Sequence, residues 1–200
     1  MTIIYQIENS LYVNLTNKCP CSCTFCVRID HDTVGQNDNL WLPHDPSLEE
    51  ILDDLKNYNL DSYDQIVFCG YGEPLTRIET VIEVCKYIRE KSKIKIRVNT
   101  NGLADLIHNK PTAELLEGYV DAISISLNAP TKEEYLKVAR PRFGIESFDA
   151  LLKFATDCKK YIGSVTFSVV DKVISKEQIE ASRKLAEEMG IGLRVREYIE

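Results

Sequence analysis

The strongest constraint on the fold is a regular alternation of short β-rich segments with amphipathic helical segments. The pattern predicts six strands, over residues 11–16, 64–69, 94–100, 121–129, 164–171 and 191–199. It predicts helices between them, over residues 47–58, 77–90, 103–117, 132–139, 148–161 and 175–190. Ser47 with Glu50, and Ser175 with Gln178, have the spacing of a capping box at the start of a helix. Strands that are joined through helices run parallel, so the pattern predicts an α/β protein.

The number of strand–helix units indicates how far the sheet curves. Eight such units close into a barrel that typically takes about 250 residues, whereas this chain has 200. We therefore expect an open, partial (β/α)6 TIM-like barrel that forms a single domain over residues 1–200. A flat, doubly wound sheet is the structural alternative. In both architectures the active face lies at the carboxyl ends of the strands, where the most unusual polar residues of this chain fall.

Composition and charge exclude several classes of protein. The formal net charge is −7 and no block of consecutive Lys or Arg is present, which disfavours non-specific binding to nucleic acid. The first residues do not resemble a signal peptide, and no segment is apolar enough for long enough to cross a membrane. We expect a cytoplasmic protein without a membrane partner, in which cysteines are free thiols or metal ligands rather than disulfides. Cys69, Cys85 and Cys158 are interpreted as small buried residues.

Four cysteines lie within eight positions of the stretch LTNKCPCSCTFCVR, residues 15–28. Cys19, Cys23 and Cys26 have the spacing C-x3-C-x2-C. Thiolates are soft ligands that favour iron–sulfur clusters, zinc or copper(I). Three of them can hold three corners of a [4Fe–4S] cluster and leave the fourth iron open for chemistry. A zinc site that uses all four cysteines, Cys21 included, is the alternative.

The chain resembles the radical SAM superfamily in two motifs. The C-x3-C-x2-C spacing follows the first predicted strand, with Phe25 directly before the last cysteine. GYGEP, residues 70–74, is similar to that family's Gly-Gly-Glu-Pro turn after the second strand, with Tyr71 in place of the first glycine. More narrowly, LTNKCPCSCTFCVR, FCGYGEPL and SISLNA resemble the small TatD-associated radical SAM proteins. The resemblance covers almost the whole chain and implies the family's (β/α)6 partial barrel.

This resemblance implies an enzyme with a [4Fe–4S] cluster and S-adenosylmethionine as cofactors. Cys19, Cys23 and Cys26 would bind the cluster, and Cys21 has no implied role. Reductive cleavage of S-adenosylmethionine would yield a 5′-deoxyadenosyl radical that abstracts hydrogen from an unidentified substrate. A reductant such as flavodoxin or ferredoxin would supply the electron. The residues that the resemblance places against S-adenosylmethionine are Phe25, Gly70, Tyr71, Gly72 and Glu73.

Polar residues at the ends of the third and fourth strands are further candidates for that contact. Asn99 and Thr100 end one strand, while Ser124, Ser126 and Asn128 alternate along the next and so share one face. Buried hydroxyl and amide groups need partners, and the ribose and carboxylate groups of S-adenosylmethionine are candidates, chiefly for Ser126 and Asn128. A buried ladder of Ser–Asn hydrogen bonds is the alternative.

Three arginines are candidates for holding the substrate. Arg140 and Arg142, joined by Arg28 beyond the cysteines, have the chemistry to grip a carboxylate or a phosphate. The alternative is arginines in solvated loops or in surface ion pairs. Residues 30–32, with the sequence DHD, are a weaker candidate metal site, because a loop gives the ligands no fixed scaffold. Trp41 is expected to pack this long loop onto the barrel.

The motifs do not identify the substrate, so several functions stay open. One is a glycyl-radical-type activating enzyme that acts on a partner protein. Another is base modification like that of the small deazaguanine synthases. A non-catalytic iron–sulfur sensor or carrier would need the cluster but no S-adenosylmethionine. We expect neither an auxiliary cluster nor a large substrate domain, and the rim could be closed by a homodimer partner or another protein. A functional link to a TatD-type hydrolase is a further expectation.

Overall fold

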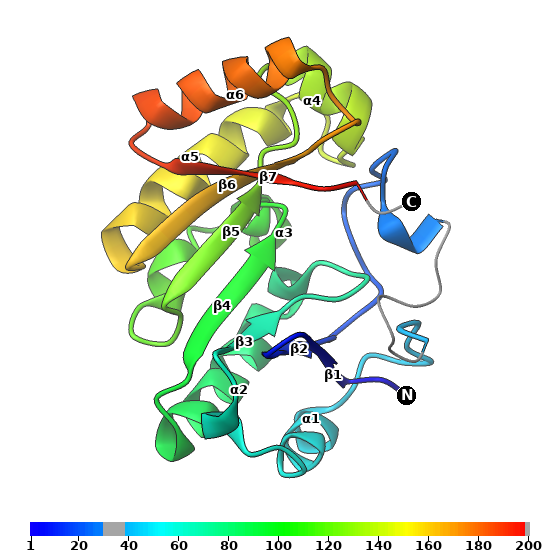
Figure 1. Ribbon diagram of the computed structural model, residues 1–200, viewed down its shortest axis with the longest axis vertical. Helices are drawn as coiled ribbons and strands as arrows, with labels where there is room; N and C mark the ends of the chain where they lie inside the picture. The colour runs from blue at the N-terminus through cyan, green and yellow to red at the C-terminus, as the bar shows by residue number, and fades with distance from the viewer. Residues whose placement is uncertain (30–38, 199–200) are drawn as a thin grey trace.

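The computed structural model describes residues 1–29 and 39–198, which form one open sheet with helices packed on it (Figure 1). The strands are β1 (Ile4–Ile7), β2 (Ser10–Val13), β3 (Gln65–Phe68), β4 (Lys95–Thr100), β5 (Ala122–Ser126), β6 (Ser164–Val170) and β7 (Gly192–Arg196). They lie side by side in the order of the sequence. Strands β2 to β7 are parallel, and β1 is antiparallel to β2. This sequential order has no switch point of the doubly wound kind, so the open partial barrel is confirmed.

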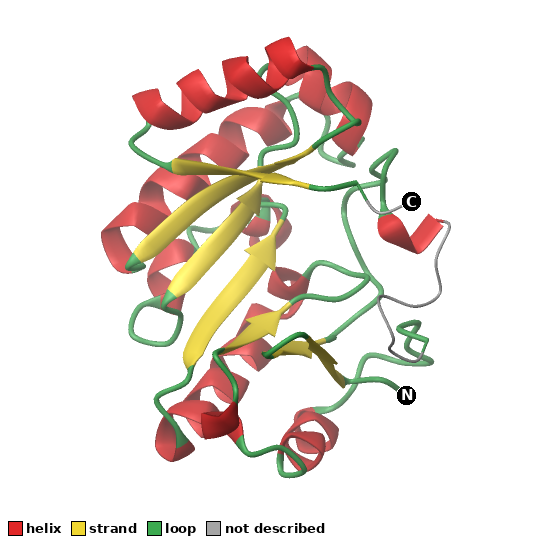
Figure 2. Cartoon of the chain, viewed as in Figure 1, coloured by secondary structure: helices red, strands yellow, loops and turns green. Residues whose placement is uncertain are grey.

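Helices flank the sheet on the side away from the cysteine loop (Figure 2). They are α1 (Leu48–Leu55), α2 (Ile78–Lys91), α3 (Ala104–His108), α4 (Lys132–Ala139), α5 (Glu146–Tyr161) and α6 (Lys176–Glu188). Short 3-10 helices are η1 (Val27–Ile29), η2 (Leu60–Ser62), η3 (Pro74–Arg77) and η4 (Ala113–Leu116). The capping boxes predicted at Ser47 and Ser175 are both formed. Within residues 1–29 and 39–198, no helix is long and apolar enough to cross a membrane.

Strand β1 corrects the sequence prediction, which began the sheet at residue 11. Ile4 pairs with Val13 and Ile7 with Ser10, so β1 and β2 form a tight hairpin. Glu8 in its turn has φ +52°, a left-handed conformation in which only a few per cent of non-glycine residues are found. The predicted strand 121–129 is also shorter, because Asn128 adopts φ +63° just after β5.

The two faces of the sheet differ in chemistry, because successive side chains along a strand point to opposite sides. The face toward the helices is apolar and buried, with Leu11, Ile66, Val98, Ile123 and Phe167 in the main core. The other face, which we call the concave face, is formed by the alternate positions. Its polar members in the described chain include Tyr12, Arg97, Asn99, Ser124, Ser126, Ser168, Arg194 and Arg196. A polar concave face lined by parallel strand ends is where a partial barrel places its site.

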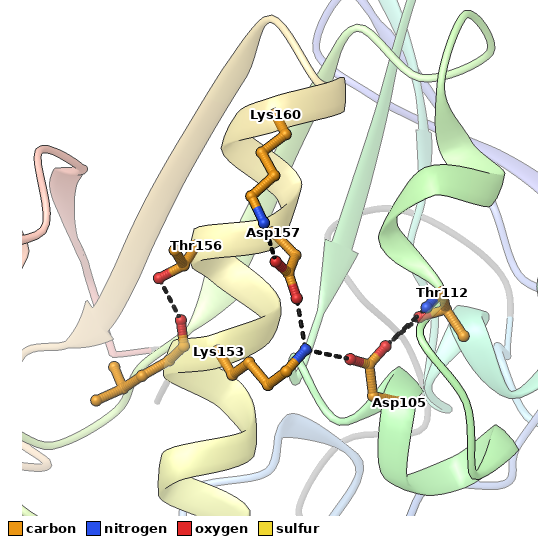
Figure 3. A network of polar contacts seen from close by, with 7 residues as sticks. Asp105, Thr112, Lys153, Thr156, Asp157 and Lys160 are labelled. Atoms are coloured by element: carbon orange, nitrogen blue, oxygen red, sulfur yellow. Dashed lines mark hydrogen bonds and ion pairs between the residues drawn. The ribbon is translucent and has the colours of Figure 1, made fainter.

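On the helical side, a network of charges ties α3 to α5 (Figure 3). Lys153 Nζ lies 2.6 Å from Asp157 Oδ2 and 3.8 Å from Asp105 Oδ2. Lys160 Nζ lies 2.6 Å from Asp157 Oδ1. Asp105 Oδ1 accepts hydrogen bonds from the backbone N–H and the hydroxyl of Thr112, at 2.9 and 2.7 Å. We call this the helical-face network; each of its charged groups has an opposite charge within it.

Candidate functional site

A cavity of about 250 Å³ opens on the concave face at the carboxyl ends of the strands. Its lining includes these residues predicted from the sequence: Cys19, Cys23, Phe25, Cys26, Gly70, Gly72, Glu73, Asn99, Thr100, Ser126 and Asn128. They come from the carboxyl ends of β4 and β5 and from the segments that follow β2, β3 and β5. The parallel strands therefore bring to one place the motifs that are far apart in the sequence.

The cysteine loop is held against the last turn of α4 and the segment that follows it. Backbone N–H groups of Ser22 and Thr24 donate to the carbonyls of Ala139 and Val138, at 3.2 and 2.9 Å. Cys21 pairs with Pro141 in an isolated antiparallel bridge and is only 3% exposed. Cys19, Cys23 and Cys26 are half-buried instead. All four cysteines line the cavity, but Cys21 is more buried than the other three.

Hydrogen bonding among the cysteines changes their acidity. The pKa of Cys19 is lowered to about 6, chiefly because the Cys21 side chain hydrogen-bonds to it, although burial opposes this. The same kind of contact lowers the pKa of Cys23, and it raises the pKa of Cys21. Burial raises the pKa of Cys26. Cys21 is therefore the thiol that keeps its proton, while Cys19 and Cys23 favour the thiolate form that binds metals.

The turn after β3 packs so closely on the chain leaving β2 that its two glycines have no room for a side chain. A Cβ on Gly70 would lie 2.1 Å from Asn14 Oδ1. A Cβ on Gly72 would lie 2.3 Å from the carbonyl oxygen of Thr16. The turn backbone therefore forms part of the cavity wall itself, since Gly70 and Gly72 both line it.

Tyr71, which stands between these glycines, is placed differently from the expectation. Its side chain is 4% exposed and packs in a small cluster with Tyr5 and Leu40, and it is not among the lining residues of the cavity. Trp41 meets its ring edge-on, with centroids 5.2 Å apart, which confirms that Trp41 packs the loop onto the barrel. The Tyr71 carbonyl accepts from Arg28 at 3.4 Å. Tyr71 thus anchors the turn from behind.

Glu73 connects the ends of β3 and β4. Its carboxylate accepts from the Thr100 hydroxyl at 2.7 Å, the Asn101 backbone N–H at 2.7 Å and the Leu75 backbone N–H at 3.0 Å. The side chain is 3% exposed, and burial raises its pKa to about 7 although these donors oppose the rise. Its nearest neighbours are hydrogen-bond donors rather than a cation. An ammonium group placed in the cavity would find this carboxylate fixed in position.

Two amide oxygens at the cavity are left without a donor. Oδ1 of Asn99 and Oδ1 of Asn128 are buried, and no described residue hydrogen-bonds to either. The backbone N–H of Asn128 donates to the Ser168 carbonyl at 3.2 Å, which holds the residue at the rim. A closed Ser–Asn ladder would have paired these oxygens, so in the described chain that alternative does not account for them. They are acceptors open to a group in the cavity.

The arginines predicted to grip the substrate are not in this lining. Arg28 and Arg142 line a second cavity, of about 480 Å³, beside the cysteine loop, together with Lys18 and Cys19. Arg140 lines neither of the two cavities and ends α4 with φ +46°. The structure therefore brings Arg28 and Arg142 together but separates them from Arg140.

Other residues at the cavity were not found from the sequence. Arg194 and Arg196 line it, and Arg97 lies two residues before Asn99 on the concave face of β4. Cys69 was interpreted as a buried residue but is half-buried and lines the cavity; Cys85 and Cys158 are fully buried as predicted. The alternation IRVN and LRVR carried the signal for the arginines.

The weaker metal site predicted at residues 30–32 lies outside the described residues. Across residues 1–29 and 39–198, no three His, Cys, Asp or Glu side chains are arranged to hold a single metal ion. A [4Fe–4S] cluster has a different requirement, because each thiolate binds a separate iron at a separate corner.

The sequence model of the radical SAM superfamily matches residues 13–186. A GTP 3′,8-cyclase of Clostridium perfringens (strain 13) is 29% identical over 186 residues, which cover 92% of this chain and 53% of that enzyme. A Methanocaldococcus jannaschii protein, named as a candidate glycyl-radical enzyme activating enzyme, is 30% identical over 189 residues, covering 90% of this chain and 69% of that protein. The chain thus spans about half the length of the GTP 3′,8-cyclase it matches.

Solved structures share the fold. Streptococcus suis SuiB bound to S-adenosylmethionine superposes with a TM-score of 0.69 at 19% identity, over 97% of this chain and 41% of SuiB. A radical SAM methyltransferase from Sphaerobacter thermophilus gives a TM-score of 0.63 at 18% identity, over 97% of this chain and 68% of that one. At this identity the likeness concerns the arrangement of strands and helices.

Proposed function

Because this chain belongs to the radical SAM superfamily, we propose that it is an enzyme that binds a [4Fe–4S] cluster and cleaves S-adenosylmethionine reductively. When bound, these two groups and one electron supply methionine and a 5′-deoxyadenosyl radical, which takes a hydrogen atom from a substrate and leaves as 5′-deoxyadenosine. The observation that carries the proposal is one cavity in which accessible thiols meet unpaired acceptors. Neither feature is needed for the fold alone.

Cys19, Cys23 and Cys26 would hold the cluster. All three line the cavity and are half-buried, so they can reach a group placed there while the surrounding loop limits access of water. The lowered pKa values of Cys19 and Cys23 favour the thiolate that an iron ligand must be. Cys21 would stay a protonated, buried thiol that supports the loop.

Glu73 and the turn around Gly72 would receive the ammonium group of S-adenosylmethionine. The carboxylate of Glu73 accepts three hydrogen bonds from the protein. An ionised carboxylate offers roughly four lone-pair sites, so about one is left for a donor in the cavity. Because the three internal bonds already orient the carboxylate, little ordering is needed when the ammonium group binds.

Asn99, Ser126 and Asn128 would orient the remaining polar groups of S-adenosylmethionine. Each of the two asparagines has a free buried amide oxygen, which suits a ribose hydroxyl. Their amide N–H groups and the Ser126 hydroxyl suit a carboxylate. Phe25 and Thr100, which line the same cavity, complete the proposed contacts.

The substrate is proposed only by class. The relatives that are GTP 3′,8-cyclases are named for a reaction on a nucleoside triphosphate, which favours a small anionic substrate here. The second candidate is activation of a glycyl-radical enzyme, and the 30% identity over 90% of the chain to a candidate activating enzyme supports it. The first would leave a modified small molecule, and the second a radical on a partner protein.

Narrower features of the proposal rest on the sequence motifs. FCGYGEPL and SISLNA support a place among the TatD-associated radical SAM proteins, with a functional link to a TatD-type hydrolase. A flavodoxin- or ferredoxin-type reductant would deliver the electron. Lys18, Arg28 and Arg142 form a basic cavity beside Cys19, which would suit the acidic surface of such a carrier. A homodimer partner that closes the rim belongs to the same proposal.

The test is anaerobic reconstitution with iron and sulfide, followed by reduction with dithionite in the presence of S-adenosylmethionine. We expect visible cluster absorption and formation of 5′-deoxyadenosine. Cys23→Ala should abolish both, whereas Cys21→Ala should leave both largely intact. A cluster without 5′-deoxyadenosine would indicate a sensor or carrier, and equal damage by Cys21→Ala would overturn the choice of ligands.

A further inference from the structure

We propose that Arg97, Arg194 and Arg196 form an anion site on the concave face, which holds a phosphate or carboxylate group of a small substrate. The inference rests on the proposed function, because it places the substrate in the cavity where the radical would be made. It adds the chemical class of the group that is recognised and the residues that recognise it. None of these arginines belongs to the cysteine or glycine motifs.

The sheet register brings the three arginines to one face. Arg194 lies beside Ser168, and Arg196 beside Val170, in the pairing of β6 with β7. All four of these residues line the cavity. Arg97 lies on β4, two residues before Asn99 and on the same face, while Ile96 and Val98 on either side of Arg97 belong to the core. Strand β7, at the edge of the described sheet, thus faces β4 across the concave face.

The charges of the three arginines meet at two concave-face side chains. Burial raises the pKa of Cys69, and the charges of Arg196 and Arg97 both oppose that rise. Burial also raises the pKa of Tyr12, and the charges of Arg97 and Arg194 oppose it. The charge of Arg97 thus acts on both side chains, together with that of Arg196 on Cys69 and that of Arg194 on Tyr12.

Two carboxylate residues, Glu73 and Glu197, line the same cavity as Arg194 and Arg196. Within residues 1–29 and 39–198, none of the three arginines forms an ion pair, and the Nε of Arg97 is buried without a hydrogen-bond partner. Arg194 and Arg196 are exposed residues of β7 and both line the cavity, so a ligand in the cavity can reach them. By contrast, Arg89 on α2 pairs with Asp121 at 2.5 Å.

The chemistry of the patch selects the class of ligand. One guanidinium group can donate two parallel hydrogen bonds to two oxygens of a phosphate or a carboxylate. Several guanidinium groups around one site favour a multiply charged anion. The chain as a whole has a formal net charge of −7, so attraction of an anion must be local to this patch. Phosphate and carboxylate share this chemistry, and the experiment distinguishes them.

The experiment measures binding to the full chain with its cluster loaded, by isothermal titration calorimetry under anaerobic conditions. Inorganic phosphate and succinate are titrated separately at constant ionic strength, with and without saturating S-adenosylmethionine. The variants are Arg194→Gln and Arg196→Gln, with Arg194→Lys as the version that keeps the charge. Arg183→Gln, an exposed arginine of α6 that lies 3.5 Å from Glu180, is the matched control.

We expect one of the two anions to bind, with affinity at least about tenfold weaker in Arg194→Gln and in Arg196→Gln. Arg194→Lys should restore part of the affinity, and Arg183→Gln should match the wild type. The preferred anion identifies the group. Circular dichroism and thermal midpoints separate lost binding from lost folding, and where one variant is unfolded the other two still decide.

The site would be overturned by no binding of either anion, by equal binding in all variants, or by loss of binding in Arg142→Gln instead. Displacement of the anion by S-adenosylmethionine would also overturn it, since the arginines would then serve the methionine carboxylate. Formation of 5′-deoxyadenosine is measured on the same wild-type sample. Cleavage of S-adenosylmethionine without anion binding rejects the anion site and keeps the proposed function. Anion binding without cleavage keeps the anion site and rejects the proposed function.

Discussion

The helical face and the concave face of this sheet both carry charged side chains, but they differ in how those charges are paired. In the helical-face network every charge has its counterpart: Lys153 and Lys160 meet Asp157, and Asp105 meets Lys153 and Thr112 (Figure 3). On the concave face, within residues 1–29 and 39–198, Arg97, Arg194 and Arg196 form no ion pair, and Oδ1 of Asn99 and of Asn128 accepts no hydrogen bond. Buried polar groups in native proteins are nearly always paired. The unpaired oxygens at the cavity therefore indicate that a ligand binds there.

The difference also concerns the backbone. Around the cavity, the turn at Gly70 and Gly72 is in contact with the chain after β2 at distances that exclude even a methyl group. By contrast, a Cβ added at Gly163, which precedes β6, would lie 3.6 Å from the Asp121 carbonyl oxygen, an ordinary contact distance. The turn at Gly70 and Gly72 is therefore too tightly packed for a side chain, whereas Gly163 has room for a methyl group. Substitutions on the two faces should differ in size and in what they disturb.

The largest effect is expected from Gly72→Ala. Its Cβ would lie 2.3 Å from the Thr16 carbonyl and 2.7 Å from the Lys18 carbonyl, both backbone atoms that cannot move alone. We expect a loss of more than about 4 kcal/mol in the free energy of unfolding, measured by urea denaturation of the cluster-free chain. Gly163→Ala is the control and should change stability by less than about 1 kcal/mol. Equal losses in the two variants would show that the rim is no more rigid than the rest.

Next in size is the dependence on pH that Glu73 introduces. Burial raises its pKa in the folded chain to about 7 from 4.5. A raised folded pKa means that the stabilising contribution is present below the unfolded value and is lost as pH rises through the folded value. Relative to Glu73→Gln, the wild type should therefore lose roughly 3 kcal/mol between pH 4.5 and pH 8. Denaturation of both proteins across this range gives the difference directly. A wild type that keeps or gains stability relative to Glu73→Gln as the pH rises would contradict the burial argument.

Much of this contrast could be predicted from the sequence, and the exceptions have physical causes. The strand–helix alternation, the cysteine spacing and the Gly-Gly-Glu-Pro-like turn are local patterns, so they located the sheet and most of the cavity lining. Strand β1 was missed because its four residues pair only through a hairpin whose Glu8 takes a left-handed conformation. The burial of Tyr71 depends on Tyr5 and Leu40, which no local pattern connects to it.

The choice of arginines shows the same limit of local sequence patterns. Arg140 and Arg142 were chosen because they are neighbours in the sequence, yet only Arg142 lines a cavity, and it is the one beside the cysteine loop. Arg97 and Arg194 come from β4 and β7, and their meeting depends on the register of strands far apart in the chain. The alternation of polar and apolar residues along each strand was visible in the sequence. Which face of the sheet the helices leave uncovered could be decided only from the structure.

A smaller effect, confined to stability, is expected from Asp105→Ala on the helical face. The substitution removes two hydrogen bonds from Thr112 and one ion pair, and leaves the Thr112 backbone N–H without its acceptor. We expect a loss of about 1–3 kcal/mol in the free energy of unfolding. Cluster absorption and 5′-deoxyadenosine formed per cluster should match the wild type. A loss of cleavage in a folded, cluster-loaded Asp105→Ala protein would show that the two faces are coupled.

The smallest effect is expected from Lys160→Met, which tests whether completeness of the helical-face network matters for anything but solubility. Lys160 is 60% exposed and pairs with Asp157, which keeps a second cation, Lys153, at 2.6 Å. Exposed pairs contribute about 0.2–1 kcal/mol, and the remaining pair reduces the loss further, so we expect less than about 0.5 kcal/mol. At about 1 M salt the Debye length is near 3 Å, so the difference from wild type should vanish there in urea denaturation. A loss above about 1 kcal/mol that persists at high salt would mean that the network holds α5 in place through packing. The two faces would then differ only in whether their charges are paired, and no longer in how much the fold depends on them.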